Sequence, residues 1–286
     1  MKYIIYIIIS LLALTFSYSQ NSNTEMALYN IGSGAIGGSI GAVINKKKGE
    51  KTGKVLLKGF LQGALGGYLV YESKNRIGKI VEKGRLEHSW EGKILNSAGV
   101  SIIENAASNR DFWDKWHINI GFNRLEFYTK NKFKFKYKIT PVSLILTTIV
   151  ATKNQFDFEN TLRTGELIFK NNAINGNNYS GLTYGNVIIF NKNLDDITRT
   201  LSHEIIHVYQ YYDFNYINSY FDKPRKKWKE NISFIEKMNS VFYMDFQAGV
   251  LRSLYLIENS NRTNYYDNFF EYEAGFYSKT SDFILK

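Results

Sequence analysis

The chain has 286 residues, of which 44% are hydrophobic and 16% aromatic, so it can bury a core in one large domain or two modest ones. It contains no cysteine, which excludes disulfides, cysteine–zinc sites and a lipid-anchored cysteine. Any bound metal must therefore use histidine and carboxylate ligands. The formal charge of +10 suits acidic partners or an anionic membrane surface, but no nucleic-acid-binding motif accompanies it, so we expect no nucleic-acid partner.

The first residues have the pattern of a secretory signal peptide. One lysine precedes the apolar run Ile4 to Phe16, and Ser17-Tyr18-Ser19 fits the small-x-small site of signal peptidase. We therefore predict a signal peptide over residues 1–19 and export to the periplasm or cell envelope. An uncleaved anchor is the alternative, although the apolar run is shorter than the about 20 residues that span a bilayer.

Two glycine-rich arms follow, Leu28 to Ile44 and Val55 to Val70, joined by a basic linker. Glycines recur four residues apart in both arms, and this small-xxx-small spacing lets membrane helices approach closely. We predict a glycine-zipper-like helical hairpin over residues 28–70 that associates with a membrane. A soluble glycine-rich helical pair is the alternative. Residues 71–112 are mixed and polar, and we expect a connecting region with short helices.

From Trp113 the hydrophobic period changes to two. Residues 118–122 alternate apolar and polar side chains, and residues 133–139 alternate apolar or aromatic side chains with lysines. This pattern predicts a β-hairpin with its turn near residues 130–131, its apolar face in the core and its lysines in solvent. A platform for anionic lipid is the alternative reading of the lysines. Bounded apolar runs predict further strands at residues 142–151, 165–169 and 187–190.

The most informative stretch is Leu201 to Tyr212, which contains the pentapeptide His203-Glu204-Ile205-Ile206-His207. Its apolar residues follow helical spacing, and Asp195, Asp196 or Thr198 could cap the helix. Histidines four apart project from one face of a helix, so both can bind one zinc ion. Glu204 can then accept a proton from the zinc-bound water and deliver it to a leaving amine. A buried amphipathic helix with two incidental histidines is the alternative.

A strand close to this helix could align a substrate. An extended peptide pairs with an exposed sheet edge through main-chain hydrogen bonds, without needing a particular sequence. Residues 185–190 are our candidate edge, because only residues 191–196 separate them from the HEIIH helix. Residues 215–286 are helical by pattern and would form a second lobe. A third metal ligand is expected near their end, in the stretch Asn268 to Gly275.

With these residues in view, the sequence resembles a gluzincin. In this group of zinc metallopeptidases HExxH supplies two ligands, and a later helix often reads Glu, aromatic, any residue, Ala, as Glu271-Tyr272-Glu273-Ala274 does here. The resemblance covers about residues 183–286. It implies that zinc is bound by His203, His207 and Glu271, with Glu204 as the general base.

Further details of the resemblance concern the surroundings of the zinc. Glu273 is the alternative third ligand, but on a helix it points about 200° away from Glu271, whose face continues through small residues. By analogy Tyr265 or Tyr266 would stabilise a developing oxyanion. Some membrane gluzincins have an aspartate four residues after the third ligand, where this chain has Gly275, so one carboxylate that would orient a ligand is missing. No third histidine follows HEIIH, so the metzincin pattern is absent.

The predicted fold is α+β. A zincin-like two-lobed domain over residues 113–286, with an antiparallel-rich sheet, the HExxH helix and a helical C-terminal lobe, follows the glycine-rich hairpin. The predicted function is an exported zinc-dependent metallopeptidase that hydrolyses peptide or protein substrates. One alternative is a catalytically weak zincin-like scaffold or binding module of the envelope. Another is a membrane-associated glycine-zipper protein whose HEIIH is structural.

Overall fold

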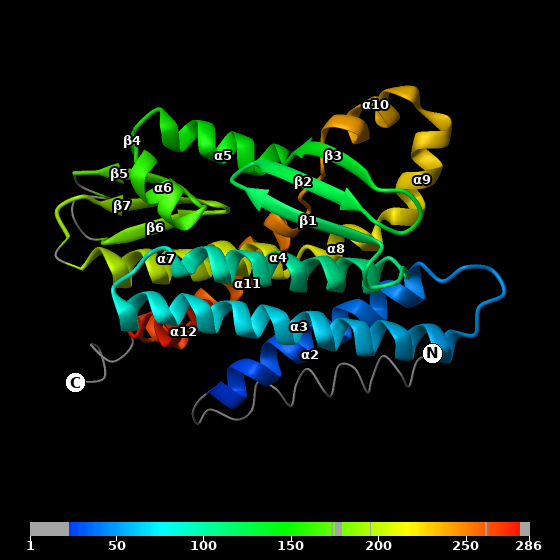
Figure 1. The fold of residues 1–286 in the computed structure, drawn as a ribbon, viewed down its shortest axis with the longest axis horizontal. Helices are drawn as coiled ribbons and strands as arrows, with labels where there is room; N and C mark the ends of the chain where they lie inside the picture. The colour runs from blue at the N-terminus through cyan, green and yellow to red at the C-terminus, as the bar shows by residue number, and fades with distance from the viewer. Residues whose placement is uncertain (1–22, 173, 175–178, 195, 261, 281–286) are drawn as a thin grey trace.

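The computed structural model describes residues 23–172, 174, 179–194, 196–260 and 262–280 (Figure 1). The predicted signal peptide at residues 1–19 lies outside these residues. The described chain combines many helices with two small sheets, so the α+β prediction is confirmed, whereas its zincin-like character stays a prediction.

Three long helices follow one another at the start of the described chain: α2 (Asn23–Ile44), α3 (Thr52–Lys83) and α4 (His88–Ala107). Glycines hold α2 against α3, because a Cβ on Gly34 would lie 2.4 Å from the carbonyl oxygen of Gly63. The predicted helical arms are therefore present and packed through their glycines. The expected short helices at residues 71–112 are wrong: α3 continues to Lys83 because Ile77 and Ile80, both fully buried, extend its core-facing side.

The glycine-rich helices share a core with the HEIIH helix. Met26 and Val70 belong to the same buried cluster as Leu201 and Ile205. Within the described residues, α2 is the one helix long and apolar enough to cross a membrane, and 44% of its apolar window is buried in the protein. By length and composition this helix could be a signal sequence or an anchor, and a membrane-spanning hairpin stays a prediction.

The first sheet is antiparallel and consists of β1 (Lys115–Ile120), β2 (Asn123–Tyr128) and β3 (Lys134–Ile139), in that order. The predicted turn near residues 130–131 joins β2 to β3. A second turn between β1 and β2, at Gly121 with φ of +54°, was not predicted.

The expected orientation of β3 is wrong. Phe133, Phe135 and Tyr137 are 67%, 51% and 47% exposed, whereas Lys136 and Lys138 lie opposite Glu126 and Arg124 on the inner face. The sheet turns this polar face towards α4 because the buried Glu104 carboxylate of α4 binds Arg124 and Lys115.

The segment 142–151 is a helix, α5 (Pro141–Ala151), and its predicted strand is wrong. A short apolar run fits a buried strand or a helix equally well by pattern. Here Pro141 favours a helical first turn, and Ser143, Thr147 and Val150 bury one helical face.

The second sheet has the order β4-β5-β7-β6, with β5 and β7 parallel and the other pairs antiparallel. Its members are β4 (Gln155–Phe156), β5 (Leu167–Asn171), β6 (Gly181–Tyr184) and β7 (Val187–Asn191), with α6 (Phe158–Thr164) before β5. The strands predicted at residues 165–169 and 187–190 correspond to β5 and β7. The candidate edge at residues 185–190 is wrong, because β7 lies between β5 and β6. The edge strands of this sheet are β4 and β6.

The remaining described residues are mostly helical, as predicted. It forms α7 (Ile197–Asp213), α8 (Tyr216–Tyr220), α9 (Asp222–Asn231), α10 (Ser233–Val241), α11 (Gln247–Ser260), a 3₁₀ turn (Tyr265–Asp267) and α12 (Phe269–Ser278). Figure 1 shows α7 beneath the second sheet, and α7 also packs against α3 and α12. This places the HEIIH helix at the centre of the molecule.

Candidate metal centre

Helix α7 begins where the sequence predicts. The Asp196 carboxylate accepts a hydrogen bond from the Arg199 backbone N–H at 3.1 Å, which caps the helix. Leu201, Ile205 and Val208 are fully buried. The apolar face of the helix is thereby fixed in the core, and the orientation of the two histidines is fixed with it.

His203, His207 and Glu271 meet between α7 and α12. The Nε2 atoms of the two histidines lie 3.1 Å apart, and each faces the same oxygen, Oε2 of Glu271, at 3.1 and 3.2 Å respectively. In the described part of the chain this is the only group of three such side chains with ligand atoms close enough to hold a metal. Four-coordinate bonds of about 2.0 Å place ligand atoms about 3.3 Å apart, so the spacing fits one zinc ion.

Gln210 binds Nδ1 of His207, so that Nε2 is the ring nitrogen that faces His203 and Glu271. Nδ1 of His207 lies 2.8 Å from Oε1 of Gln210, while Nε2 of Gln210 donates to the Phe270 carbonyl and to Glu273. Because Oε1 of Gln210 can only accept, Nδ1 of His207 carries a proton, so the neutral ring would offer the lone pair of Nε2 to a metal.

His203 has hydroxyl partners at the corresponding position. Its Nδ1 lies 3.4 Å from Oγ of Ser278 and 3.3 Å from Oγ1 of Thr280. The Ser278 hydroxyl donates to the Ala274 carbonyl at 2.7 Å, so its oxygen can accept from His203. Gly275 occupies the position at which some membrane gluzincins have an aspartate. In this chain the two hydroxyls are the polar groups next to Nδ1 of His203.

Glu271 is held from its other side. Its Oε1 accepts a hydrogen bond of 2.7 Å from the Tyr255 hydroxyl, which leaves Oε2 for the histidines. Helix α12 is capped by Asn268, whose side chain accepts from the Phe270 N–H at 2.9 Å. A Cβ on Gly275 would lie 2.5 Å from the Tyr266 ring, so glycine there allows the ring to pack on α12.

Glu273 takes no part in this cluster. Its Oε1 lies 2.8 Å from Nζ of Lys74, and both side chains are fully buried. Asn30 on α2 also donates to Glu273, at 3.1 Å, and Lys74 pairs with Asp213 at 2.6 Å. The structure therefore brings Glu271 to the histidines and uses Glu273 to join α12 to α2 and α3.

Glu204 is buried beside the edge strand β6. Its Oε2 accepts a hydrogen bond of 2.7 Å from the Thr183 hydroxyl. A Cβ on Gly181 would lie 2.7 Å from its Oε1, so glycine in β6 makes room for the carboxylate. Glu204 thus packs against the face of β6 that carries Gly181 and Thr183.

The pKa values show that the cluster attracts positive charge. Burial alone would lower the pKa of His207, but the Glu271 carboxylate outweighs it and raises the pKa to about 9. Burial would raise the pKa of Glu271, yet the two histidines bring it well below its usual range. Burial raises the pKa of Glu204, against the opposing effect of both histidines. A proton on His207 therefore compensates the negative charge of Glu271, as a bound cation would.

The two candidate tyrosines have different surroundings. Burial, followed by the nearby charge of Glu271, raises the pKa of the Tyr265 phenol strongly. The Tyr266 hydroxyl instead donates to Thr280 at 3.0 Å. Tyr265 lies at the cluster, whereas Tyr266 supports the residues around it.

Sequence reasoning missed three residues that support the cluster: Gln210, Tyr255 and Thr183. Gln210 follows His207 by three positions and so shares its helix face, which is a signal the sequence does carry. Tyr255 on α11 and Thr183 on β6 reach the site only through tertiary packing.

In comparisons with known proteins, no protein-family model, curated protein or solved structure matches the chain. The functional argument therefore depends on the residues and their geometry.

Proposed function

We propose that this protein is a zinc-dependent metallopeptidase that hydrolyses peptide bonds. The observation that carries the proposal is the convergence of Nε2 of His203, Nε2 of His207 and Oε2 of Glu271 at mutual distances of 3.1 to 3.2 Å. Two buried carboxylates, Glu204 and Glu271, also favour a divalent cation on grounds of charge.

The donor set suits zinc, which would be held by His203, His207 and Glu271. Zinc bound there would supply a water of lowered pKa and polarise the scissile carbonyl. Glu204 would accept the proton of the attacking water and pass it to the leaving amine. Its burial next to Thr183 holds the carboxylate in one orientation. The Tyr265 hydroxyl would donate a hydrogen bond to the developing oxyanion.

The edge strand β6 gives the substrate a place to bind. A peptide that paired with β6 would extend the second sheet beside Glu204. Main-chain hydrogen bonds would hold it, so we expect a broad sequence preference. The signal-peptide pattern and the apolar helix α2 favour a peptidase that is exported to the periplasm or cell envelope and attached there through its N-terminal helices.

A catalytically weak zinc-binding module is the second candidate. The observation that favours it is the partner of His203, which is a pair of hydroxyls at 3.3 and 3.4 Å, where a carboxylate would make the imidazole more basic.

Metal analysis and cleavage assays on the purified chain test both candidates. A peptidase binds one zinc per chain and cleaves casein or a peptide library until a chelator removes the metal. Zinc without cleavage supports the binding module. Failure to bind zinc at micromolar concentration contradicts both, and then HEIIH is a structural helix.

A further inference from the structure

A second polar region lies on the inner face of the first sheet. An open cavity of about 530 Å³ is bordered by β1 to β3, α4 and the helices α8 to α10. Seven basic side chains line it against four acidic ones. None of the proposed zinc ligands is among them, so this cavity is separate from the metal centre.

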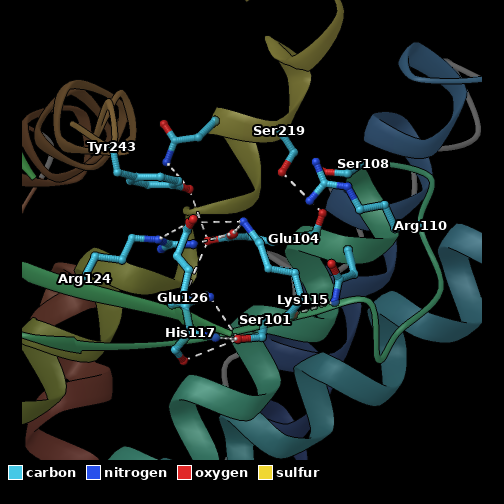
Figure 2. Close-up of polar contacts among 12 residues, drawn as sticks. Ser101, Glu104, Ser108, Arg110, Lys115, His117, Arg124, Glu126, Ser219 and Tyr243 are labelled. Carbon is cyan, nitrogen blue, oxygen red and sulfur yellow. Dashed lines mark hydrogen bonds and ion pairs between the residues drawn. The ribbon is translucent and has the colours of Figure 1, made fainter. Parts of the chain in front are cut away.

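The floor of the cavity is a network of buried charges (Figure 2). Arg124, fully buried, lies 2.8 Å from Glu104 and 2.9 Å from Glu126, and its guanidinium is 3.7 Å from the centre of the Tyr243 ring. Lys115 lies 3.1 Å from Glu104 and 3.5 Å from Glu126. These two cations already neutralise the two carboxylates.

Lys138 adds a positive charge that this network leaves uncompensated. Its nearest carboxylate oxygen, on Glu126, is 3.9 Å away, and that carboxylate also serves Arg124 and Lys115. Only 13% of the Lys138 side chain is exposed. Burial lowers its pKa to about 8, against the opposing effect of Glu126. A partly buried ammonium without its own counter-ion is unfavourable, and a bound anion would relieve it.

Lys136 stands next to Lys138 on the same face of β3. Among the described residues no carboxylate lies within 4.0 Å of its ammonium, which is 5.3 Å from the centre of the Tyr128 ring. Within the described residues, neither lysine therefore has a carboxylate of its own, because Glu126 is shared with Arg124 and Lys115.

Elsewhere in the cavity lining, one of the protein's own carboxylates, Asp222, is bound by basic and hydroxyl groups. The Asp222 carboxylate is bound by Arg110 at 3.0 Å, by the Ser108 hydroxyl at 2.8 Å and by Arg225. Two guanidinium groups and a hydroxyl around one carboxylate are the groups that also recognise phosphate.

We propose that this cavity binds a phosphate-bearing anion, with Lys136 and Lys138 as its charge partners. A phosphate dianion matches the charges of these two lysines, which a single carboxylate does not. The volume lies within the about 300 to 1,000 Å³ typical of small-ligand sites, so an organic group can accompany the phosphate. A soluble phosphorylated molecule and a phospholipid headgroup share this chemistry.

Calorimetric titration of the full-length chain with pyrophosphate tests the soluble form. The protein is treated with chelator first, so that a metal at His203 and His207 cannot hold the probe. Lys136→Met combined with Lys138→Met should weaken binding about tenfold or more, because each lysine contributes a charge-assisted hydrogen bond. Lys192→Met, which removes an exposed lysine after β7, should leave it unchanged. Equal binding by all three proteins overturns the proposal for pyrophosphate.

Flotation with vesicles tests the lipid form. Phosphatidylglycerol in phosphatidylcholine is compared with phosphatidylcholine alone. Loss of vesicle binding in the double variant, but not in Lys192→Met, identifies a headgroup as the ligand. Vesicle binding that is the same in all three proteins reflects general charge and counts against the lipid form. Absence of lysine-dependent binding in both assays overturns the proposal.

Thermal unfolding guards against a variant that loses binding because it unfolds. Lys138→Met removes a charge without its own partner, so its melting temperature without anion should equal or exceed that of the parent. Pyrophosphate should raise the melting temperature of the parent but not of Lys138→Met. Lys138→Arg keeps the charge and should keep the response. If Lys138→Met has a lower melting temperature than the parent, the test uses the single variant Lys136→Met. Unchanged pyrophosphate binding by Lys136→Met then contradicts the assignment.

Discussion

Two buried clusters of charge in this protein have opposite requirements. At the candidate metal centre Glu204 and Glu271 are buried, and within the described residues neither pairs with a lysine or arginine. At the first sheet Glu104 and Glu126 are equally buried, but Arg124 and Lys115 bind both, and Lys138 adds a further cation. Within the described residues the first cluster has no lysine or arginine partner, and the second has one more cation than carboxylates. A buried glutamate thus indicates a metal site only when its neighbours leave its charge unmatched.

Substitution of Glu204 is expected to have the largest effect. Glu204→Gln keeps the size of the side chain but cannot take a proton, so turnover should fall about 10²- to 10⁴-fold while zinc remains bound. Metal analysis and a peptide-cleavage assay on the same preparation measure both quantities. Glu166→Gln is the matched control, since Glu166 is equally buried but pairs with Lys93 at 2.7 Å. Unchanged turnover in Glu204→Gln would remove the enzymatic assignment.

The two glutamates of α12 should give opposite patterns. Glu271→Ala should lose zinc, because it removes one of three ligand atoms. Glu273→Ala should keep zinc but lower the free energy of unfolding by about 3 kcal/mol, because it breaks a buried ion pair and leaves Lys74 with Asp213 alone. Urea unfolding and zinc titration of both variants check this. Loss of zinc in Glu273→Ala with zinc retained in Glu271→Ala would mean that the other face of α12 meets the metal.

The cluster at the first sheet should make the fold sensitive to acid through His117. Burial, followed by the charge of Arg124, lowers the pKa of this histidine to about 3. The unfolded chain has a histidine pKa of about 6.5, so between these values only the unfolded state takes up the proton. The contribution of His117 to stability is complete above pH 6.5 and is lost as the pH falls, by about 1.4 kcal/mol per unit.

Urea unfolding from pH 7.5 to pH 5, with chelator present, measures this slope. His117→Asn should flatten it, and His88→Asn, at a more exposed histidine that contacts Glu91, should not. If His117→Asn leaves the slope unchanged, the buried cluster does not keep His117 neutral.

Much of the site follows from spacing within single helices. The i, i+4 histidines, the Asp196 cap and the small residues that follow Glu271 are local patterns, and the structure brings the named ligands together. Tyr255 and Thr183 could not be predicted, because α11 and β6 carry no local sign of what they approach. Their positions depend on how the helices and the sheet pack.

The same limit explains the errors in the fold. The alternation in β3 correctly predicts a strand, but which face is buried depends on the partner, and α4 presents Glu104 to the lysine side. The apolar run of α5 lacks a period that separates helix from strand. In both cases the deciding contact comes from another element of the chain.

The smallest predicted effect tests whether the hydrogen bonds around the metal centre matter as the geometry suggests. Gln210 accepts from Nδ1 of His207 and donates to Glu273 and the Phe270 carbonyl, so it fixes the tautomer that presents Nε2 to the metal. Gln210→Ala should weaken zinc binding about 10- to 100-fold, as the loss of such a partner does in known zinc sites. Competition with a fluorescent chelator measures the affinity. Gln247→Ala, at a buried glutamine that bonds Asn218, should cost stability and leave zinc affinity unchanged. Equal affinities in the two variants would show that His207 keeps its orientation through packing alone, because the ring would then need no acceptor on Nδ1.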